Sequence, residues 1–371
     1  MMKYVIRTDF FLCCLLFLNV NSIQIPSNIT QYPTNPIWTG YLADPFVFEV
    51  NGTYYIIGTG RKSIEQHTFP ALTSNDLIKW TYVGEILQIT KQVNQPSTYW
   101  APEIAENDGI FYLFYSVGFG DSKHRLRVVS SNSPLGPYKD SQSIELTNVT
   151  RLSFAIDPHP FYDTASQQWY LFYSRDFLDT NNGYRVGTGI VVDRLIYNMT
   201  KLAGNETIVL RAKHDWQLYQ HNRFIYNQTY DWYTLQGSFI WQHDSGVYVC
   251  FYTGGNWQNQ SYGIDYAISY SSPMGPYIEN TSNQVRITHS IEGIVIGPGH
   301  NSIIASHDKQ TTYIVYHAWN EPKTIRSPYI SQLNWKTILS NKPYSGHDFL
   351  LVTLTFLVYI VVILLIFHHA L

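Results

Sequence analysis

Short runs of Tyr, Phe, Val and Ile recur along this chain, each bounded by turn-forming residues. The five clearest runs read NGTYYIIGTG, GIFYLFYSVG, QQWYLFYSRD, GVYVCFYTGG and QTTYIVYHAW. Aromatic and β-branched residues in runs of this length are typical of β-strands, and no helical period extends beyond a turn or two. The pattern therefore predicts an all-β protein built from five similar units.

The turns that follow these runs repeat as well. The segment SSNSPLGPY ends at Tyr138, and the nearly identical SYSSPMGPY ends at Tyr277, where Pro and Gly reverse the chain. Each unit then corresponds to one antiparallel sheet, and sheets stacked around an axis protect their edges and leave a central channel. We expect a five-bladed β-propeller over residues 23–335. A β-sandwich is the alternative, but it does not explain five similar units.

The hydrophobic pattern changes near the N-terminus. Lys3 and Arg7 precede an apolar run over residues 10–20, and the small residue Ser22 follows it. This arrangement predicts a secretory signal peptide over residues 1–22. An uncleaved anchor is the alternative, although the run is shorter than the ~20 residues that a bilayer span needs.

The pattern changes again at the C-terminus, where residues 349–367 carry no charge. That length suits a transmembrane helix or the hydrophobic tail of a GPI-anchor signal. Residues 336–348 are expected to be a linker. We therefore expect a protein of the secretory pathway that is held at the extracellular face of a membrane.

The cysteines and the glycosylation sequons are consistent with the secretory pathway. Cleavage of the signal peptide removes Cys13 and Cys14 and leaves Cys250, which lies in an apolar run and is expected to be a buried thiol. Eight Asn-X-Ser/Thr sequons predict a glycoprotein: Asn28, Asn51, Asn148, Asn198, Asn205, Asn227, Asn259 and Asn280.

Composition narrows the class of ligand. Charged residues make up 14% of the chain and aromatic residues 16%, which indicates a well-filled interior. The formal net charge of −3 does not provide the basic surface of a nucleic-acid binder. A neutral ligand such as an oligo- or polysaccharide fits better.

Candidate catalytic side chains stand in similar local settings in three of the units. Asp44 lies in LADPFVF, Asp157 in FAIDPHPFYD and Gln236 in TLQGSFIW. Equivalent positions on the innermost strands of a propeller point towards its axis, so residues far apart in sequence can meet in one pocket. An Asp-Pro pair by itself more often marks a turn.

Together with four further segments, these motifs resemble glycoside hydrolase family 43 in their order along the chain. The further segments are YWAPEI with Trp100 and Glu103, IGPGHNSI with His300, YHAW, and ISQLNW. The resemblance implies a five-bladed propeller that hydrolyses α-L-arabinofuranosidic or β-D-xylosidic bonds with inversion. It implies that Asp44 is the general base and that Asp157 tunes the pKa of the general acid and orients it. The acid is a Glu in that family, and Gln236 takes its place here.

The chemistry of inversion explains why this replacement matters. One carboxylate must activate water and one carboxylic acid must protonate the leaving oxygen, about 6.5 to 9.5 Å apart. Asp157 would help an adjacent acid to keep its proton, because two negative charges disfavour each other. Gln236 has no such proton, so a general-acid contribution of about 10² to 10⁴ in rate is lost for a poor leaving group. Glu103 and Glu292 are the carboxylates considered as a replacement.

Further residues are expected to contact the ligand. Trp38, Trp100 and Trp257 are candidates to stack on sugar rings, although Trp in repeated strands is as often part of the core. Glu103 is expected to be structural or to contact sugar.

Two more positions are assigned by the resemblance. It places a substrate-reaching Arg at Arg326, for which a surface Arg near the final strand is the alternative. At His300 it places a His near the axis that contacts a structural calcium ion or its waters. A lone His is otherwise more often a hydrogen-bonded core residue, and calcium prefers oxygen ligands, so direct coordination by protein would be sparse. No other cofactor is expected.

Two functions stay open at this point. The first is an extracellular arabinofuranosidase, xylosidase or related glycan hydrolase that is slowed by Gln236. The second is a pseudo-hydrolase that binds glycans at the cell surface without cutting them.

Overall fold

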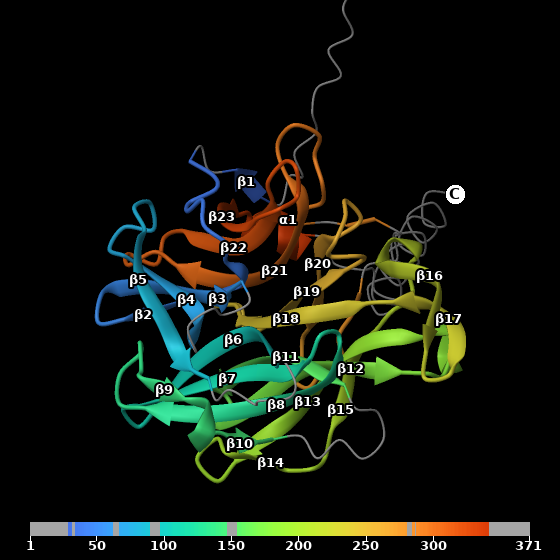
Figure 1. Cartoon of the computed structure of the whole chain (residues 1–371), viewed down its shortest axis with the longest axis horizontal. Coiled ribbons are helices and arrows are strands. Elements are labelled where there is room, and N and C mark those ends of the chain that lie inside the picture. The colour runs from blue at the N-terminus through green and yellow to red at the C-terminus, as the bar shows by residue number, and fades with distance from the viewer. Residues whose placement is uncertain are drawn as a thin grey trace, which may run out of the picture.

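The computed structural model describes residues 29–31, 34–61, 67–89, 97–146, 154–279, 284–285 and 287–340. Over these residues the strands form five sheets, coloured in chain order in Figure 1. The prediction of an all-β protein is confirmed. The predicted signal peptide at 1–22 and the apolar segment at 349–367 lie outside the described residues, and no helix within them is long and apolar enough to cross a membrane.

The first two sheets come from the N-terminal part of the chain. One pairs in the order β2 (Ala43–Val50), β3 (Thr53–Thr59), β4 (His67–Ser74), β5 (Thr81–Gln88) and β9 (Tyr138–Lys139). The other pairs in the order β6 (Thr98–Asn107), β7 (Ile110–Phe119), β8 (Ser122–Ser131) and β10 (Ile144–Glu145).

The third sheet is the largest and carries an extra hairpin. It follows the path β11 (Ala155–Asp163), β12 (Gln168–Phe177), β13 (Gly187–Ile196), β17 (Gln228–Tyr233) and β16 (Leu218–Ile225), and β14 (Lys201–Leu202) and β15 (Thr207–Arg211) also pair with β13. Figure 1 shows the β16–β17 hairpin at the right-hand edge of the molecule.

The last two sheets complete the domain. One pairs β18 (Leu235–Gln242), β19 (Tyr248–Gly254) and β20 (Gly263–Ser269), and the other pairs β21 (Ile296–Ala305), β22 (Thr312–Trp319), β23 (Arg326–Leu333) and β1 (Ile29–Gln31). The described helices are short: α1 (Trp335–Ser340) and 3-10 turns at Asp140–Gln142, Asn181–Gly183 and Asp215–Gln217.

The first strands of the five sheets pack against one another in a ring. β2 contacts β6 and β21, β11 contacts β6 and β18, and β18 contacts β21. The five aromatic runs form the second strands, namely β3, β7, β12, β19 and β22. The sheets are thus arranged around a common axis as in a propeller, with the aromatic runs buried between neighbouring sheets.

The interior between the sheets is filled by these aromatic strands. Tyr115, Phe251 and Tyr316 are fully buried, and burying one such apolar ring is worth about 1.5 to 3 kcal/mol relative to leaving it exposed. Cys250 is also fully buried, and burial raises the pKa of its thiol, so it is a structural side chain as expected.

The packed domain continues past the expected boundary at residue 335. Helix α1 begins at Trp335, and its Ile338 is fully buried in the same hydrophobic cluster as Tyr316. The hydroxyl of Tyr266 donates a hydrogen bond to the carbonyl of Ile338 over 3.2 Å. The first residues assigned to a linker therefore belong to the folded domain.

Candidate active site

A bulge recurs at the start of the innermost strands. In β2, β6, β11 and β18 the pairing with the second strand shifts register, and one residue there has a left-handed backbone. These residues are Asp44 (φ 50°), Ala101 (φ 47°), Asp157 (φ 59°) and Gly237 (φ 57°). Such a conformation costs a non-glycine residue of order 1 kcal/mol or more and gathers at functional sites, where bulges re-aim side chains. Asp44 and Asp157 therefore occupy equivalent places on two strands.

Gln236 is not the third member of this equivalent set, contrary to the sequence-based prediction. The left-handed residue of β18 is Gly237, and Gln236 stands one residue before it. The positive φ of Gly237 favours glycine, and a Cβ atom there would also make a tight contact of 3.0 Å with the ring of His300. The amide of Gln236 therefore reaches the pocket from the neighbouring position.

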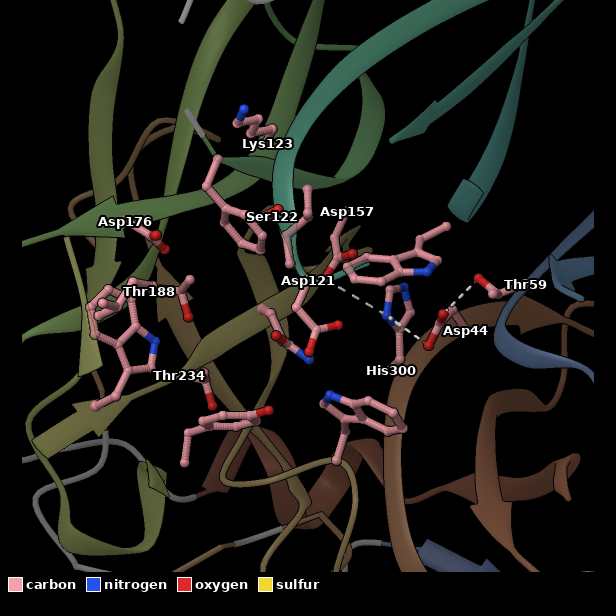
Figure 2. Close-up of a pocket in the computed structure, with 18 of the residues that line it drawn as sticks. Asp44, Thr59, Asp121, Ser122, Lys123, Asp157, Asp176, Thr188, Thr234 and His300 are labelled. Carbon is pink, nitrogen blue, oxygen red and sulfur yellow. Dashed lines mark hydrogen bonds and ion pairs between the residues drawn. The ribbon is translucent and has the colours of Figure 1, made fainter. Parts of the chain in front are cut away.

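A pocket of about 610 Å³ brings together most of the predicted residues (Figure 2). Those that line it are Asp44, Trp100, Asp157, Gln236, Trp257, His300 and Arg326. Pockets of roughly 300 to 1,000 Å³ typically hold small organic ligands. The residues come from β2, β6, β11, β18, β21 and β23 and from the loop after β19, so the ring of strands assembles the site.

The carboxylate of Asp44 is fixed by the sheets on both sides. Thr59 donates a hydrogen bond to its Oδ2 over 2.6 Å, and the same hydroxyl accepts the backbone N–H of Ala101 over 2.8 Å. Arg326 places a guanidinium nitrogen 3.5 Å from Oδ1. The Nδ1 atom of His300 lies at the same distance from Oδ1.

These contacts keep Asp44 ionised. Burial by itself would raise its pKa, but the positive charge of Arg326 and the nearby His300 outweigh burial and lower the pKa to about 2. His317 adds no charge at neutral pH, because burial lowers its pKa well below the usual value and its Nδ1 accepts the N–H of Asp44 over 3.0 Å. Arg326 is thus the main cation beside a carboxylate that can accept a proton from water.

The pKa of Asp157 is raised, whereas that of Asp44 is lowered. Burial raises its pKa to about 6, helped by the negative charge of Asp44 and only partly offset by His300, whose Nδ1 lies 3.9 Å from Oδ2. The backbone N–H of Gly237 donates a hydrogen bond to Asp157 Oδ2 over 3.0 Å. Asp157 therefore holds the strand at the residue next to Gln236, and the two aspartates have pKa values far apart in one pocket.

Gln236 is held by a buried tyrosine. Its Nε2 donates a hydrogen bond over 2.8 Å to the hydroxyl of Tyr262. Burial, followed by the charge of Asp44, raises the pKa of Tyr262 far above its usual value, so this phenol stays protonated. The amide can accept or donate a hydrogen bond in the pocket, but it supplies no acidic proton.

Aromatic rings form the wall near Asp44. The guanidinium of Arg326 lies 4.6 Å from the ring centre of Trp257, and the ring of Trp257 stacks on Trp319 at 6.2 Å. Trp100 stacks on His124 with ring centres 3.7 Å apart. Trp100 and Trp257 are half-buried and line the pocket, so their rings offer apolar surface that suits a ligand with C–H faces and hydroxyl groups.

Three residues considered from the sequence lie away from the pocket. Trp38 packs on Tyr82 with ring centres 5.7 Å apart. Glu103 is buried, and its Oε2 bonds to His159 Nδ1 over 2.7 Å, so its role in the structure is to link β6 with β11. Glu292 is exposed and does not line the pocket. Neither glutamate is placed to protonate a ligand bound beside Asp44.

The structure adds residues that the sequence analysis did not single out. Asp176 and Thr188 line the pocket from β12 and β13, and Tyr226 and Trp232 line it from the β16–β17 hairpin. A sequence signal for Asp176 exists: it is the last residue of the run QQWYLFYSRD, where the other four runs end in Gly or Trp. A charged residue at that point of a repeated strand indicates a position under a different constraint.

Asp176 makes the stability of the fold depend on pH. Burial raises its pKa from 3.8 to about 7, and the hydrogen bond from Tyr226 and the charges of Arg223 and Arg175 offset burial only in part. Because the folded-state pKa is raised, this carboxyl stabilises the fold below about pH 4 and loses that contribution as the pH rises towards 7.

We therefore compare the free energy of unfolding of Asp176→Asn with that of the native protein. This difference should shift in favour of the variant by about 2 to 3 kcal/mol when the pH rises from 5 to 8, because one unit of pKa shift corresponds to about 1.36 kcal/mol. Urea unfolding of the two proteins at both pH values measures it. Glu292→Gln is the control, since Glu292 is exposed and lies outside the pocket. An equal stability difference at the two pH values for Asp176→Asn would contradict the prediction.

The described residues contain no group of three or more His, Cys, Asp or Glu side chains that could hold a metal ion. Near His300, the side-chain Oδ1 and Nδ2 of the buried Asn301 have no hydrogen-bond partner. One free oxygen and one imidazole do not make the cage of six to eight oxygens that calcium takes. The residues present therefore do not by themselves fit a calcium ion.

Comparison with known proteins identifies relatives over the whole of this domain. The family model described as Glycosyl hydrolases family 43 matches residues 33–337. Beta-D-galactofuranosidase xynD of Aspergillus niger is 28% identical over 299 residues, which cover 76% of this chain and 75% of that protein. Extracellular endo-alpha-(1->5)-L-arabinanase 1 of Bacillus subtilis is 25% identical over 312 residues, which cover 80% of this chain and 86% of that protein.

Solved structures share the fold. A thermostable family-43 glycoside hydrolase superimposes with a TM-score of 0.66 at 26% identity, over 81% of this chain and 92% of that one. An endo-arabinase from Bacteroides thetaiotaomicron gives a TM-score of 0.59 at 19% identity, over 79% of this chain and 94% of that one, which bears on the fold alone.

Proposed function

Since this chain belongs to glycosyl hydrolases family 43, we propose that it hydrolyses glycosidic bonds in glycans built from arabinose, xylose or galactofuranose. One observation carries the proposal: Asp44 and Asp157, on equivalent bulges of β2 and β11, face one pocket with different pKa values. Family members are glycoside hydrolases, and the names of the relatives supply the sugars. The choice among these sugars depends on the loops around the pocket.

The proposed reaction is hydrolysis with inversion. Asp44, ionised beside Arg326, takes a proton from a water molecule that attacks the anomeric carbon, and the bond to the leaving oxygen breaks. Asp157 orients the segment at Gly237 and thereby the side chain of Gln236. Because Gln236 supplies no proton, the leaving oxygen must depart as an anion or take its proton from water, which makes poor leaving groups slow.

A second function is favoured by Gln236 itself. A glutamine at the acid position keeps the size and hydrogen-bonding reach of glutamate, so sugar binding survives while turnover falls. The protein is then a glycan-binding pseudo-hydrolase. Both functions use the same pocket and the same class of ligand.

We also propose that each of the five sheets is one blade of a five-bladed propeller, with the ring of β2, β6, β11, β18 and β21 around the axis.

An extracellular location fits this function. Relatives in Bacillus subtilis are named as extracellular arabinanases. The sequon asparagines within the described residues are all exposed, as glycan attachment requires: Asn51, Asn198, Asn205, Asn227 and Asn259. Membrane attachment through residues 349–367 is proposed on the sequence alone.

A comparison of leaving groups tests the proposed function. We expect the native protein to hydrolyse 4-nitrophenyl α-L-arabinofuranoside, β-D-xyloside or β-D-galactofuranoside at least about 10²-fold faster than the matching disaccharide, because nitrophenolate leaves without acid assistance. Product release and calorimetric binding are measured on the same preparation. Binding of the disaccharide without cleavage of any aryl glycoside would support the pseudo-hydrolase instead, and neither binding nor cleavage would overturn both functions.

A further inference from the structure

A second groove is lined by residues of β10, β14 and β15 and contains neither Asp44 nor Asp157. β10 is the edge strand of its sheet, and β14 and β15 each pair with β13 alone among the described strands. Figure 1 shows β10 and β14 at the lower edge of the molecule. The groove has a volume of about 1540 Å³, which exceeds the roughly 300 to 1,000 Å³ of a typical small-molecule site. It therefore suits an extended occupant.

Exposed apolar side chains gather in this groove. Ile144, Tyr197 and Ile208 are 46%, 72% and 48% exposed, and all three line it. The amino group of Lys201 lies 5.3 Å from the ring centre of Tyr197. Single exposed apolar residues are common, but several of them in one groove indicate a surface that another molecule covers.

The charges of the groove are balanced by ion pairs. Three such pairs include lining residues: Glu145 with Arg125 over 2.9 Å, Arg175 with Glu206 over 2.7 Å, and Arg211 with Asp179 over 2.8 Å. The groove therefore has no strong field of one sign that would attract a highly charged partner. A neutral occupant with hydroxyl and amide groups fits it better than a nucleic acid or a charged peptide.

A sequon asparagine stands at the rim of the groove. Asn205 is exposed and lies between Gly204 and Glu206, both of which line the groove. The backbone here is held in place, because Asp193 accepts the N–H of Gly204 over 2.7 Å and that of Asn205 over 3.3 Å. A Cβ atom at Gly204 would meet nothing within 4 Å, so there is room for a sugar beside it. A glycan attached to Asn205 therefore begins at the groove.

We propose that an asparagine-linked glycan on Asn205 folds back into this groove and covers Ile144, Tyr197 and Ile208. A lipid-linked oligosaccharide diphosphate donates the glycan: Nδ2 of Asn205 loses a proton and bonds to the anomeric carbon of the first N-acetylglucosamine, and the lipid diphosphate leaves. The core sugars, N-acetylglucosamine and mannose, are neutral and combine C–H faces with hydroxyl and amide groups. Such faces pack on an exposed aromatic ring like that of Tyr197.

The inference rests on the secretory route expected from the sequence, because that route supplies the glycan. It does not depend on hydrolysis of a substrate. The proposed function can therefore fail while the docked glycan stands, and the reverse also holds.

Enzymatic release of glycans from the folded protein tests the proposal. Full-length protein is secreted from cells that make high-mannose glycans and is treated with an endoglycosidase that cuts between the two core N-acetylglucosamines. Mass spectrometry of peptides then follows each sequon over time. We expect release at Asn205 to be at least about tenfold slower than at Asn51, because a docked glycan is cut only while it is out of the groove. In the unfolded protein both sites should be cut at the same rate.

Asn51 is the matched control within the same molecule. It is an exposed sequon in the turn between β2 and β3, and neither Asn51 nor Gly52 lines the groove. Both rates are read from one sample, so the amount of enzyme and the folded fraction are the same for the two sites.

A variant of the groove separates docking from simple crowding at Asn205. Tyr197→Asn removes the ring, and asparagine tolerates the left-handed backbone of this residue (φ 50°). We expect it to bring release at Asn205 close to that at Asn51. Tyr270→Ser is the control variant, since Tyr270 is also 48% exposed but does not line the groove, and it should leave release at Asn205 slow.

Three results would overturn the proposal. The first is a secreted protein without a glycan on Asn205. The second is equal release at Asn205 and Asn51 in the folded protein, which is also expected if an external glycan or a partner protein occupies the groove. The third is slow release that persists in Tyr197→Asn.

Discussion

Replacing Gln236 with glutamate is expected to raise kcat on arabino- or xylo-oligosaccharides by about 10² to 10⁴-fold, the usual contribution of a general acid. The geometry for an acid is in place: Asp157 bonds to the residue next to position 236, and the negative charges of Asp157 and Asp44 would hold the proton on a new carboxyl. The phenol of Tyr262, which accepts from Gln236 Nε2 now, can donate to a glutamate oxygen.

The gain should depend on the leaving group. Gln236→Glu should change kcat on 4-nitrophenyl glycosides by less than about tenfold, because that leaving group needs little protonation. Steady-state kinetics on both substrate types separates an acid from a general improvement of the fold. Gln236→Met, which keeps the length without an acidic proton, is the control, and an equal gain from Met and Glu would contradict the assignment of position 236.

The arrangement of sheets was predictable from the sequence because its signal is local. A second strand that is covered by sheets on both sides must be apolar throughout, and runs such as YLFYS and YVCFY show this apolar pattern in the sequence. The β16–β17 hairpin does not show it. Its strands LYQHNRFI and QTYDWY mix polar and aromatic residues, since one side faces the pocket and the other faces solvent.

The active site was predictable only in part, for a related reason. Asp44 and Asp157 stand in recognisable motifs, whereas the offset of Gln236 from them follows from the left-handed angle of Gly237 and the space taken by His300. Asp176 was missed because its burial and its raised pKa arise from packing against β13 and the β16–β17 hairpin, and the residues next to it in the sequence do not reveal that packing. Trp38 shows the reverse case, where a plausible sugar-stacking residue packs on Tyr82 instead.

Replacing Asp44 with asparagine in the Gln236→Glu protein is expected to lower kcat by about 10² to 10⁴-fold, because Arg326 and His300 keep Asp44 ionised whereas the neighbouring Asp157 has a raised pKa. Stability should fall as well. Loss of the carboxylate leaves the guanidinium of Arg326, only 9% exposed, without its anionic partner, at a cost of about 3 kcal/mol. Glu292→Gln, an exposed carboxylate outside the pocket, is the control and should change neither quantity.

The loss of kcat and the loss of stability can be separated by adding a small carboxylate that restores catalysis. In Asp44→Ala the cavity beside Arg326 and His300 can admit formate, which would accept the proton of the attacking water in place of Asp44. We expect formate to restore part of kcat in Asp44→Ala but to leave Asp44→Asn unchanged, since the asparagine side chain fills the space. Rates are measured well below the unfolding midpoint, which urea titration fixes for each variant. A loss of rate that matches the unfolded fraction, with no effect of formate, would assign Asp44 a structural role only.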